Sequence, residues 1–334
     1  MNIIIPMAGR GSRLRPHTLT TPKPLVPVAG KPIVEWLVRD IINLCPDKVD
    51  TIGFVIGDFG KEVEENLIKV AESLGAKGQI FYQDEALGTA HAIYCANELL
   101  TGPTIVAFAD TLFKTDFKIN KEDDGVIFVQ KVEDPSAFGV VKLSSDGFIT
   151  DFVEKPETFV SDLAIIGIYY FRDGVKLRSE IKYLLDNNLK YKGEFQLTDV
   201  METMRKQGTQ YRPGEVNEWL DCGNKNATVY TNQRMLEIKT PTGNISSSVK
   251  VTNATIIQPC YISENVIIKN SVVGPHVSIG ENTTILNSVI SNTIIQKNTH
   301  IKGLITTNSM IGNHVHLSCN PKDLSVGDYT NIEE

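Results

Sequence analysis

A repeated pattern between Ile245 and Leu317 constrains the fold of this chain more than any other feature. Isoleucine and valine recur there about every five or six residues, separated by Asn, Ser, Thr and Gly. This spacing is typical of a parallel β-helix, in which one apolar side chain in six points inward and Gly or Asn occupies the corners. At about eighteen residues per triangular coil, the segment predicts roughly four coils. The alternative, an ordinary β-sandwich, would show period-two alternation instead.

The sequence before this repeat alternates between strand-like and helix-like segments. That order predicts a parallel sheet covered by helices. Closely spaced strands between Gly125 and Phe171 predict a β-rich insertion or sheet edge. The composition changes at TPTGN, so we place the domain boundary between residues 239 and 240 and expect domains at 1–239 and 240–334. The expected strands are 2–7, 51–56, one ending at 83, and 104–109, and the expected helices are 33–44, 60–74, 88–99, 175–188, 197–207 and one ending near 238.

Charge and cysteine usage exclude several functional classes. The 334 residues carry a formal net charge of -7, with no run of Lys and Arg that would attract nucleic acid or an anionic membrane. The five cysteines are scattered without CxxC spacing, which predicts neither a zinc site nor a disulfide framework. No apolar stretch approaches the roughly 18 residues of a membrane span. We therefore expect a soluble cytoplasmic protein with neither a nucleic-acid nor a membrane partner.

A glycine-containing loop directly follows the first strand. Gly9, Gly11 and Ser12 would let backbone N–H groups approach phosphate oxygens, while Arg13 and Lys23 would neutralise their charge. The loop fits neither GxxxxGK[ST] nor GxGxxG, where Leu14 would stand at the third glycine. An ordinary turn is the structural alternative, but the cations favour a polyphosphate cradle.

Together with later segments, this loop resembles the sugar-1-phosphate nucleotidyltransferase family, and in particular its glucose-1-phosphate thymidylyltransferases. The resemblance implies a Rossmann-like catalytic domain with a mixed, mainly parallel sheet, followed by a left-handed parallel β-helix. Arg13 and Lys23 match the arginine and lysine of the family's GxGxR and KP elements, which implies that they bind the triphosphate and stabilise departing pyrophosphate. Ala8 stands at the first glycine of the common GGxGxR form.

Three further elements follow in the family's order. Gln83, with Gly88 and Thr89 in LGTA, resembles the base-recognition element, where the amide pairs with the base edge and the glycine leaves room for it. Asp110 and Asp221 stand at the family's two aspartates, the second within WLDCG. Two aspartates meeting at one phosphate imply a Mg²⁺ ion, whose remaining ligands are phosphate oxygens and water. Either aspartate alone would be a common turn or cap residue.

The sugar phosphate side is marked by FGVV, EKP and IGIY. By resemblance, Gly139 and Glu154 contact sugar hydroxyls, Lys155 contacts the sugar phosphate, and Gly167 lets the ring approach the backbone. The chemistry implied is a single displacement, in which the sugar phosphate oxygen attacks the α-phosphorus of a nucleoside triphosphate. Because these segments resemble thymidylyltransferases, we favour dTTP over UTP and glucose 1-phosphate as the sugar.

Two other functions compete with this interpretation. Hexapeptide β-helices also occur in acyltransferases, where a histidine such as His276, His300, His314 or His316 could act as a general base. A non-catalytic regulatory relative would keep the fold, but such relatives tend to lose a cation or an aspartate of the site. We expect the β-helix to serve assembly or regulation, and the chain to form a homo-oligomer through it.

Overall fold

The computed structural model describes residues 1–9, 11–320 and 326–327. Its contacts divide the chain into two compact units. The first unit comprises Met1–Val26 and Lys31–Asn224, and the second comprises Pro27–Gly30 and Lys225–Glu334. Residues 321–325 and 328–334 of the expected second domain lie outside the described part. No described helix has the length and apolar character required to cross a bilayer.

Helix α6 (Lys225–Lys239) groups with the second unit, so the contacts divide the chain earlier than the expected boundary after residue 239. A buried asparagine on the helix contributes to this grouping. The side-chain oxygen of Asn232 accepts hydrogen bonds from the backbone N–H of Ala29 at 2.9 Å and from the hydroxyl of Ser278 at 2.7 Å. These bonds join α6 to the Pro27–Gly30 segment and to the coil.

The first unit is built on a nine-stranded sheet with two strands pairing off its main path. β1 pairs in parallel with β4 and β6, whereas β11 is antiparallel to β6, β8 and β9. The expectation of a mixed sheet is therefore confirmed, and β11 is the strand at which its direction reverses. In sheet order the strands are β10 (Ile149–Glu154), β9 (Gly139–Leu143), β11 (Leu163–Phe171), β6 (Thr104–Ala107), β1 (Asn2–Pro6), β4 (Thr51–Ile56) and β5 (Lys77–Tyr82), with β8 (Gly125–Lys131) and β12 (Tyr211–Glu215) off the path.

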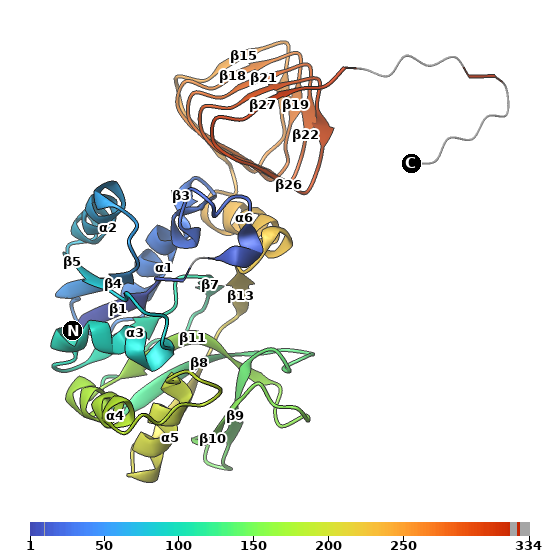
Figure 1. Ribbon diagram of the computed structural model, residues 1–334. Helices are drawn as coiled ribbons and strands as arrows, with labels where there is room; N and C mark the ends of the chain where they lie inside the picture. The colour runs from blue at the N-terminus through green and yellow to red at the C-terminus, as the bar shows by residue number, and fades with distance from the viewer. Residues whose placement is uncertain (10, 321–325, 328–334) are drawn as a thin grey trace. The chain divides into compact units, whose positions relative to one another are not determined.

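Helices α3, α4 and α5 share one hydrophobic core with the sheet (Figure 1). Ile93, Ile181 and Met201 supply this core from the helices, and Val106 and Ile127 supply it from the strands. The expected helix 88–99 proves shorter, because α3 ends at Cys95 and a 3₁₀ turn follows at Asn97–Leu99. The helices are α1 (Ile33–Ile42), α2 (Lys61–Ser73), α3 (Thr89–Cys95), α4 (Gly174–Asp186) and α5 (Leu197–Lys206).

A small ribbon crosses the end of the large sheet. β7 (Thr111–Lys114) pairs antiparallel with β13 (Glu218–Asp221), and their register places Asp221 opposite Thr111. Because β7 begins directly after Asp110, this pairing brings two segments that are far apart in the chain to one place. Short strands also occur at β2 (Pro27–Val28) and β3 (Lys31–Pro32), and 3₁₀ turns at Ser12–Leu14 and Lys23–Leu25.

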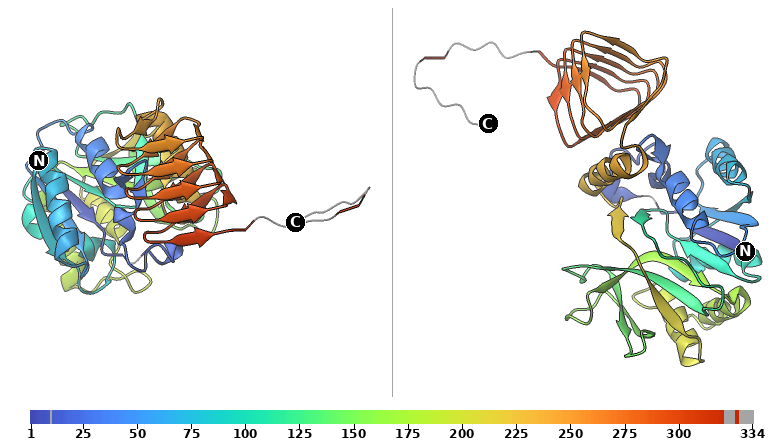
Figure 2. Two further views of the ribbon diagram at one scale, coloured as in Figure 1. Left: turned by 90° about the horizontal axis from the view of Figure 1, so that it is seen from above. Right: turned by 180° about the vertical axis from the view of Figure 1, so that it is seen from behind.

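The second unit is a coil of short strands stacked in three parallel sheets, which is the arrangement of a parallel β-helix (Figures 1 and 2). Isoleucine and valine side chains fill its interior, among them Ile268, Ile285 and Ile301. Its first face contains β14 (Asn244–Ile245), β17 (Cys260–Ile262), β20 (Val277–Ile279), β23 (Thr293–Ile295) and β26 (Ser309–Ile311); its second contains β15 (Lys250–Thr252), β18 (Ile267–Lys269), β21 (Thr284–Leu286), β24 (His300–Lys302) and β27 (His316–Ser318); its third contains β16 (Thr255–Ile256), β19 (Val272–Val273), β22 (Val289–Ile290) and β25 (Ile305–Thr306).

The coil is tighter than the repeat predicts. Tyr261 pairs with Ser278, a step of 17 residues, and Ser278 pairs with Ile294, a step of 16. The expected length of about eighteen residues per coil is therefore wrong by one or two residues, because the corners are shorter than three full hexapeptides require.

Asparagine holds most of the described corners that need a left-handed backbone, as expected from the sequence. Stacked corners are also joined by side-chain bonds, since Asn253 donates to Asn270 at 2.9 Å and Asn270 donates to Asn287 at 3.1 Å. His276 and His314 also have a left-handed backbone, with φ of 62° and 56°, at the corners that Asn292 and Asn298 occupy in a neighbouring rung. Histidine is one of the few residue types that tolerate this conformation. Apart from glycines such as Gly303, the described left-handed corner residues are Asn253, Asn265, Asn270, His276, Asn282, Asn287, Asn292, Asn298, Asn308 and His314.

The three faces of the coil differ in what they present outward. Helix α6 packs against β23 and β26 of the first face. The second face carries Lys250, Lys269 and Lys302 at strand ends. On the third face, the strands and the residues flanking them at 253–259, 270–275, 287–292 and 303–308 contain no charged residue.

Candidate active site

The glycine loop follows β1 and is packed tightly at Gly11. This residue has φ of +61°, and a Cβ there would lie 2.8 Å from the Cβ of Lys23. Glycine therefore allows the loop to close on the 3₁₀ turn that carries Lys23. The loop backbone lines a cavity through Ala8, Gly9 and Gly11, as the phosphate-cradle prediction requires.

Lys23 reaches a carboxylate that lies 87 residues further along the chain. Its ammonium nitrogen lies 2.8 Å from Oδ2 of Asp110, and only 11% of the lysine side chain is exposed. Asp110 is placed by β6, which ends three residues earlier. The structure thus brings together two residues that were predicted to belong to the same active site, Lys23 at the triphosphate and Asp110 at the Mg²⁺ ion.

Asp221 lies beside Asp110. The backbone N–H of Cys222 donates to the Asp110 carbonyl at 3.0 Å, and the N–H of Gly223 donates to Oδ1 of Asp221 at 2.9 Å. Burial and the negative charge of Asp110 raise the pKa of Asp221 above its ordinary value. Arg13 is close to the same turn, because a Cβ on Gly223 would lie 3.4 Å from its guanidinium nitrogen.

The two aspartates fit the Mg²⁺ that the sequence analysis implies. A buried carboxylate that is raised in pKa by a second carboxylate gains from a divalent cation placed between them. Among the described residues, no group of three or more His, Cys, Asp and Glu side chains is arranged to hold a metal. Two protein carboxylates suit Mg²⁺, which usually keeps waters and substrate phosphates as its other ligands.

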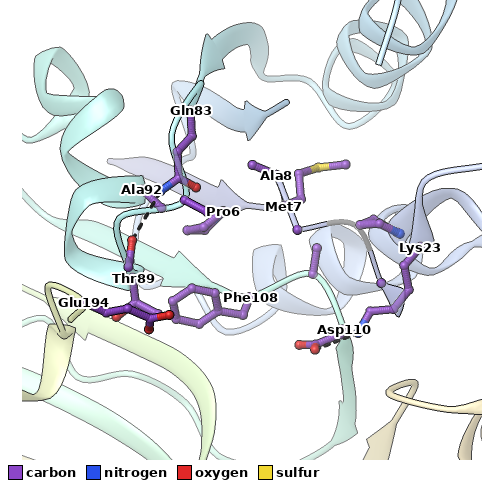
Figure 3. A pocket seen from close by; sticks show the side chains of 16 residues that line it. Pro6, Met7, Ala8, Lys23, Gln83, Thr89, Ala92, Phe108, Asp110 and Glu194 are labelled. Carbon is purple, nitrogen blue, oxygen red and sulfur yellow. Dashed lines mark hydrogen bonds and ion pairs between the residues drawn. The ribbon is translucent and has the colours of Figure 1, made fainter. Parts of the chain in front are cut away.

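The first cavity of the candidate site has a volume of about 280 Å³ and lies between the glycine loop, Lys23 and Gln83 (Figure 3). Gln83 closes one end, and Lys23 and Asp110 lie at the other. The remaining predicted nucleotide residues on its wall are Ala8, Gly9, Gly11, Gly88 and Thr89. Ser12 is exposed and is absent from the described lining of this cavity.

Gly88 has a structural reason to be glycine that the sequence analysis did not foresee. Its φ is +113°, and a Cβ there would lie 2.5 Å from the carbonyl oxygen of Phe195. Thr89 is also used by the fold, because its hydroxyl accepts a hydrogen bond from the N–H of Leu197 at 2.9 Å. The close contact between this loop and the start of α5 therefore fixes the wall of the cavity.

The second cavity has a volume of about 620 Å³ and is lined by all the residues predicted to bind the sugar phosphate. Gly139 and Glu154 are register partners on β9 and β10. Burial raises the pKa of Glu154, and Lys155 opposes that shift. Lys155 has φ of 42°, a strained value for a residue with a side chain, and such strain is concentrated at functional sites. The predicted residues on this wall are Arg13, Thr89, Asp110, Gly139, Glu154, Lys155, Gly167 and Asp221.

The two cavities adjoin, because Thr89, Phe108 and Asp110 line both. Phe108 packs edge-on against Tyr169, with ring centroids 6.1 Å apart. The sequence analysis missed Phe108, since an aromatic residue at the end of an apolar strand carries no sign of a site. It quoted Trp219 in WLDCG without assigning it a role, and this residue lines the second cavity.

The histidines of the coil have other surroundings. Nε2 of His276 lies 2.9 Å from Oε1 of Glu237 on α6. His300 and His316 stack on adjacent coils, with ring centroids 4.8 Å apart. In the described part of the coil these histidines are therefore divided between corners and a flat face.

Comparison with known proteins agrees with this geometry. The family model described as "Nucleotidyl transferase" matches residues 2–238. The bifunctional protein GlmU of Methanococcus maripaludis is 31% identical over 265 residues, covering 77% of this chain and 60% of that protein, so the chain spans about three fifths of its length. Glucose-1-phosphate thymidylyltransferase of Streptomyces griseus is 25% identical over 362 residues, covering 100% of this chain and 99% of that protein.

A solved structure, that of a glucose-1-phosphate thymidylyltransferase from Bacillus anthracis in complex with sucrose, has a TM-score of 0.61 and 25% sequence identity to the chain. It matches 73% of this chain and 97% of that one. The family model covers most of the chain. The glycine loop, Lys23 and both aspartates also lie at adjoining cavities. The chain therefore belongs to the nucleotidyl transferase family.

Proposed function

We propose that the chain transfers a nucleotidyl group from a nucleoside triphosphate to a sugar 1-phosphate and releases pyrophosphate. The observation that carries the proposal is the pair of adjoining cavities with Asp110 on their shared wall. The first cavity has the loop and lysine suited to a triphosphate, and the second has carboxylates and a lysine suited to a sugar phosphate.

The residues support a single displacement. An oxygen of the sugar 1-phosphate attacks the α-phosphorus, the bond from that phosphorus to the β-phosphate oxygen breaks, and pyrophosphate leaves with the electron pair. Lys23 and Arg13 stabilise the charge that develops on the leaving group, and Lys155 holds the attacking phosphate. Asp110 and Asp221 would hold the Mg²⁺, which supplies charge neutralisation at the α-phosphate when bound. Positioning and electrostatics are sufficient, so no protein nucleophile is required.

Glucose 1-phosphate and dTTP are the substrates we favour, with UTP as the next nucleotide. The support is the resemblance of FGVV, EKP and IGIY to thymidylyltransferases, and the full-length match to a relative of that name. Discrimination between sugars depends on single hydrogen bonds to hydroxyls. Glu154, Gly139 and Gly167 line the second cavity, and we propose that they make these hydrogen bonds.

We also propose that the chain forms a homo-oligomer through the third face of the coil. Thr255, Val272, Val289 and Ile305 are successive register partners on this face. Val289 is 46% exposed and Ile305 is 81% exposed. Depletion of charge around exposed aliphatic side chains is typical of an interface between identical subunits. The face also presents no charge that a second copy would repel.

The decisive experiment measures pyrophosphate release with glucose 1-phosphate and Mg²⁺, comparing dTTP, UTP, ATP, GTP and CTP. We expect release with a pyrimidine triphosphate and its loss in Asp110→Asn. Release by Asp110→Asn at the unmodified rate would refute the assigned site. Silence of the unmodified protein with a panel of sugar 1-phosphates would support the regulatory alternative, and acetyl transfer from acetyl-CoA would support the acyltransferase alternative.

A further inference from the structure

The side chain at the base end of the nucleotide cavity is held in one orientation. Nε2 of Gln83 lies 3.3 Å from the carbonyl oxygen of Gly88 and 3.2 Å from Nδ1 of His91. In Figure 3 the amide nitrogen of Gln83 points toward the loop before Thr89, and its amide oxygen points away from that loop, toward Pro6. His91 belongs to α3 and follows the LGTA segment directly.

The chemistry of Gly88 determines which amide atom is which. A backbone carbonyl can only accept hydrogen bonds, so the Gln83 atom that faces it must be the nitrogen. The same carbonyl also accepts from the N–H of Ala92 at 3.1 Å, which begins the helical bonding of α3. Because Gly88 is locked against Phe195, the acceptor cannot move away without disturbing the loop.

His91 then accepts a hydrogen bond from the second hydrogen of the Gln83 amide. An NH₂ group has two hydrogens, and Gly88 uses one of them. Nδ1 of His91 must therefore accept, which places the imidazole proton on Nε2 and requires a neutral ring. Burial lowers the pKa of His91, while the charge of Glu85 opposes that shift, so the neutral ring is favoured at physiological pH.

We infer that His91 is a positioning residue that holds the Gln83 amide so that its oxygen alone is presented to the base. This inference rests on the proposed function, because it assumes that the first cavity takes a nucleotide. An oxygen accepts from a ring N–H, which thymine and uracil carry at N3 and guanine carries at N1. Adenine and cytosine present a lone pair at the corresponding ring nitrogen, which the oxygen repels. The Gln83 and His91 pair therefore selects bases that have a ring N–H.

The test compares His91→Leu with His91→Asn, measuring KM and kcat for dTTP, UTP, GTP, ATP and CTP. His91→Leu fills similar space but offers no acceptor, so only the bond to Gly88 remains to hold the amide and its orientation is less restricted. We expect KM for the preferred nucleotide to rise roughly fivefold to tenfold, kcat to stay within about twofold, and discrimination against ATP and CTP to fall. His91→Asn is the matched rescue, because its Oδ1 can accept where Nδ1 does, and it should retain the discrimination.

Two results would overturn the inference in an active enzyme. One is unchanged base discrimination in His91→Leu, and the other is an equal loss in both variants, which would indicate a structural role. If the unmodified protein releases no pyrophosphate with any nucleotide, the proposed function fails, and calorimetric binding of the same triphosphates decides the inference separately. Binding that prefers the ring N–H bases and loses this preference in His91→Leu supports it, whereas equal binding of all bases, or no binding, overturns it.

Discussion

The two units place their important residues by opposite means. In the first unit, Lys23, Asp110 and Asp221 meet because distant segments pack together through β6, β7 and β13. In the coil, each side chain has its position fixed by the repeat, and its partners are one rung away. The first arrangement concentrates function in a few irreplaceable residues, whereas the second spreads stability over many similar ones. Substitutions in each unit can test this contrast.

The largest effect is expected at the shared wall of the cavities. Asp110→Asn removes the charge that pairs with Lys23 and one of the two carboxylates proposed to hold Mg²⁺. We expect kcat for pyrophosphate release to fall on the order of 10²- to 10³-fold. The melting temperature should change little, because Asp110 is partly exposed, and this separates loss of chemistry from loss of fold.

Gly88→Ala should show that a single substitution can strongly destabilise the first unit. The new Cβ would lie 2.5 Å from the Phe195 carbonyl oxygen, at a φ that alanine rarely adopts. We expect a loss of about 2 to 4 kcal/mol in the free energy of unfolding. Urea denaturation followed by near-UV circular dichroism measures it, with Gly75→Ala as control, since Gly75 also has positive φ but no atom within 4 Å of the added Cβ. An equal loss in both variants would leave only backbone strain as the cause.

Ile305→Asp tests whether the third face of the coil joins subunits. The substitution places a charge on a side chain that is 81% exposed, so the coil itself should stay folded. We expect the mass in solution to fall to that of a single chain, measured by light scattering after size exclusion. Lys302→Asp, on the second face, is the control and should leave the mass unchanged. An assembly that survives Ile305→Asp would place the interface elsewhere.

A corner of the coil should be more tolerant than Gly88. Asn270→Gly keeps the left-handed backbone but removes side-chain bonds to Asn253 and Asn287. We expect a loss of about 1 kcal/mol, since exposed hydrogen bonds contribute little each. Asn270→Ala adds the strain of positive φ and should lose about 1 kcal/mol more. A larger loss for glycine than for alanine would contradict this account of the corners.

The smallest effect concerns the charge of Glu154. Burial raises its pKa in the folded protein, so ionisation destabilises the fold as pH rises from the unfolded toward the folded pKa. Glu154→Gln removes that cost, and we expect it to gain slightly in melting temperature at pH 7. The gain in melting temperature should vanish near pH 3.5, where residue 154 is neutral in both the unmodified protein and the variant. Separately, KM for the sugar 1-phosphate should rise in the variant. A gain that is independent of pH would assign the effect to packing.

How far the sequence could predict the molecule also differs between the units. The hexapeptide pattern predicts the coil because each apolar position is a local property of the repeat. The pattern overestimates the number of residues in one coil, since the shorter corners are set by turn geometry and by the asparagines that occupy them. In the first unit, the family motifs predict Lys23, Asp110 and Gln83, and these residues do line one cavity.

Other features of the first unit depend on contacts that no local pattern records. Phe108 lines both cavities and packs on Tyr169 because β11 lies beside β6, and Gly88 is constrained by Phe195, more than a hundred residues later. The grouping of α6 with the coil rests on Asn232, whose buried side chain looks like an ordinary helical polar residue in the sequence. Long-range packing therefore supplies the part of the site that motifs leave out.

The asparagine stacks have a consequence for how such a coil changes in length. Asn270 and Asn282 each bond to the corner asparagine one rung before and one rung after, and the strands pair in the same way. Removing or duplicating one complete rung would rejoin equivalent strand partners, and only a rung that bonds to α6, such as the one with Ser278, would lose a further contact. The coil can therefore vary in length by whole rungs without any compensating change in the residues that line the nucleotide cavity.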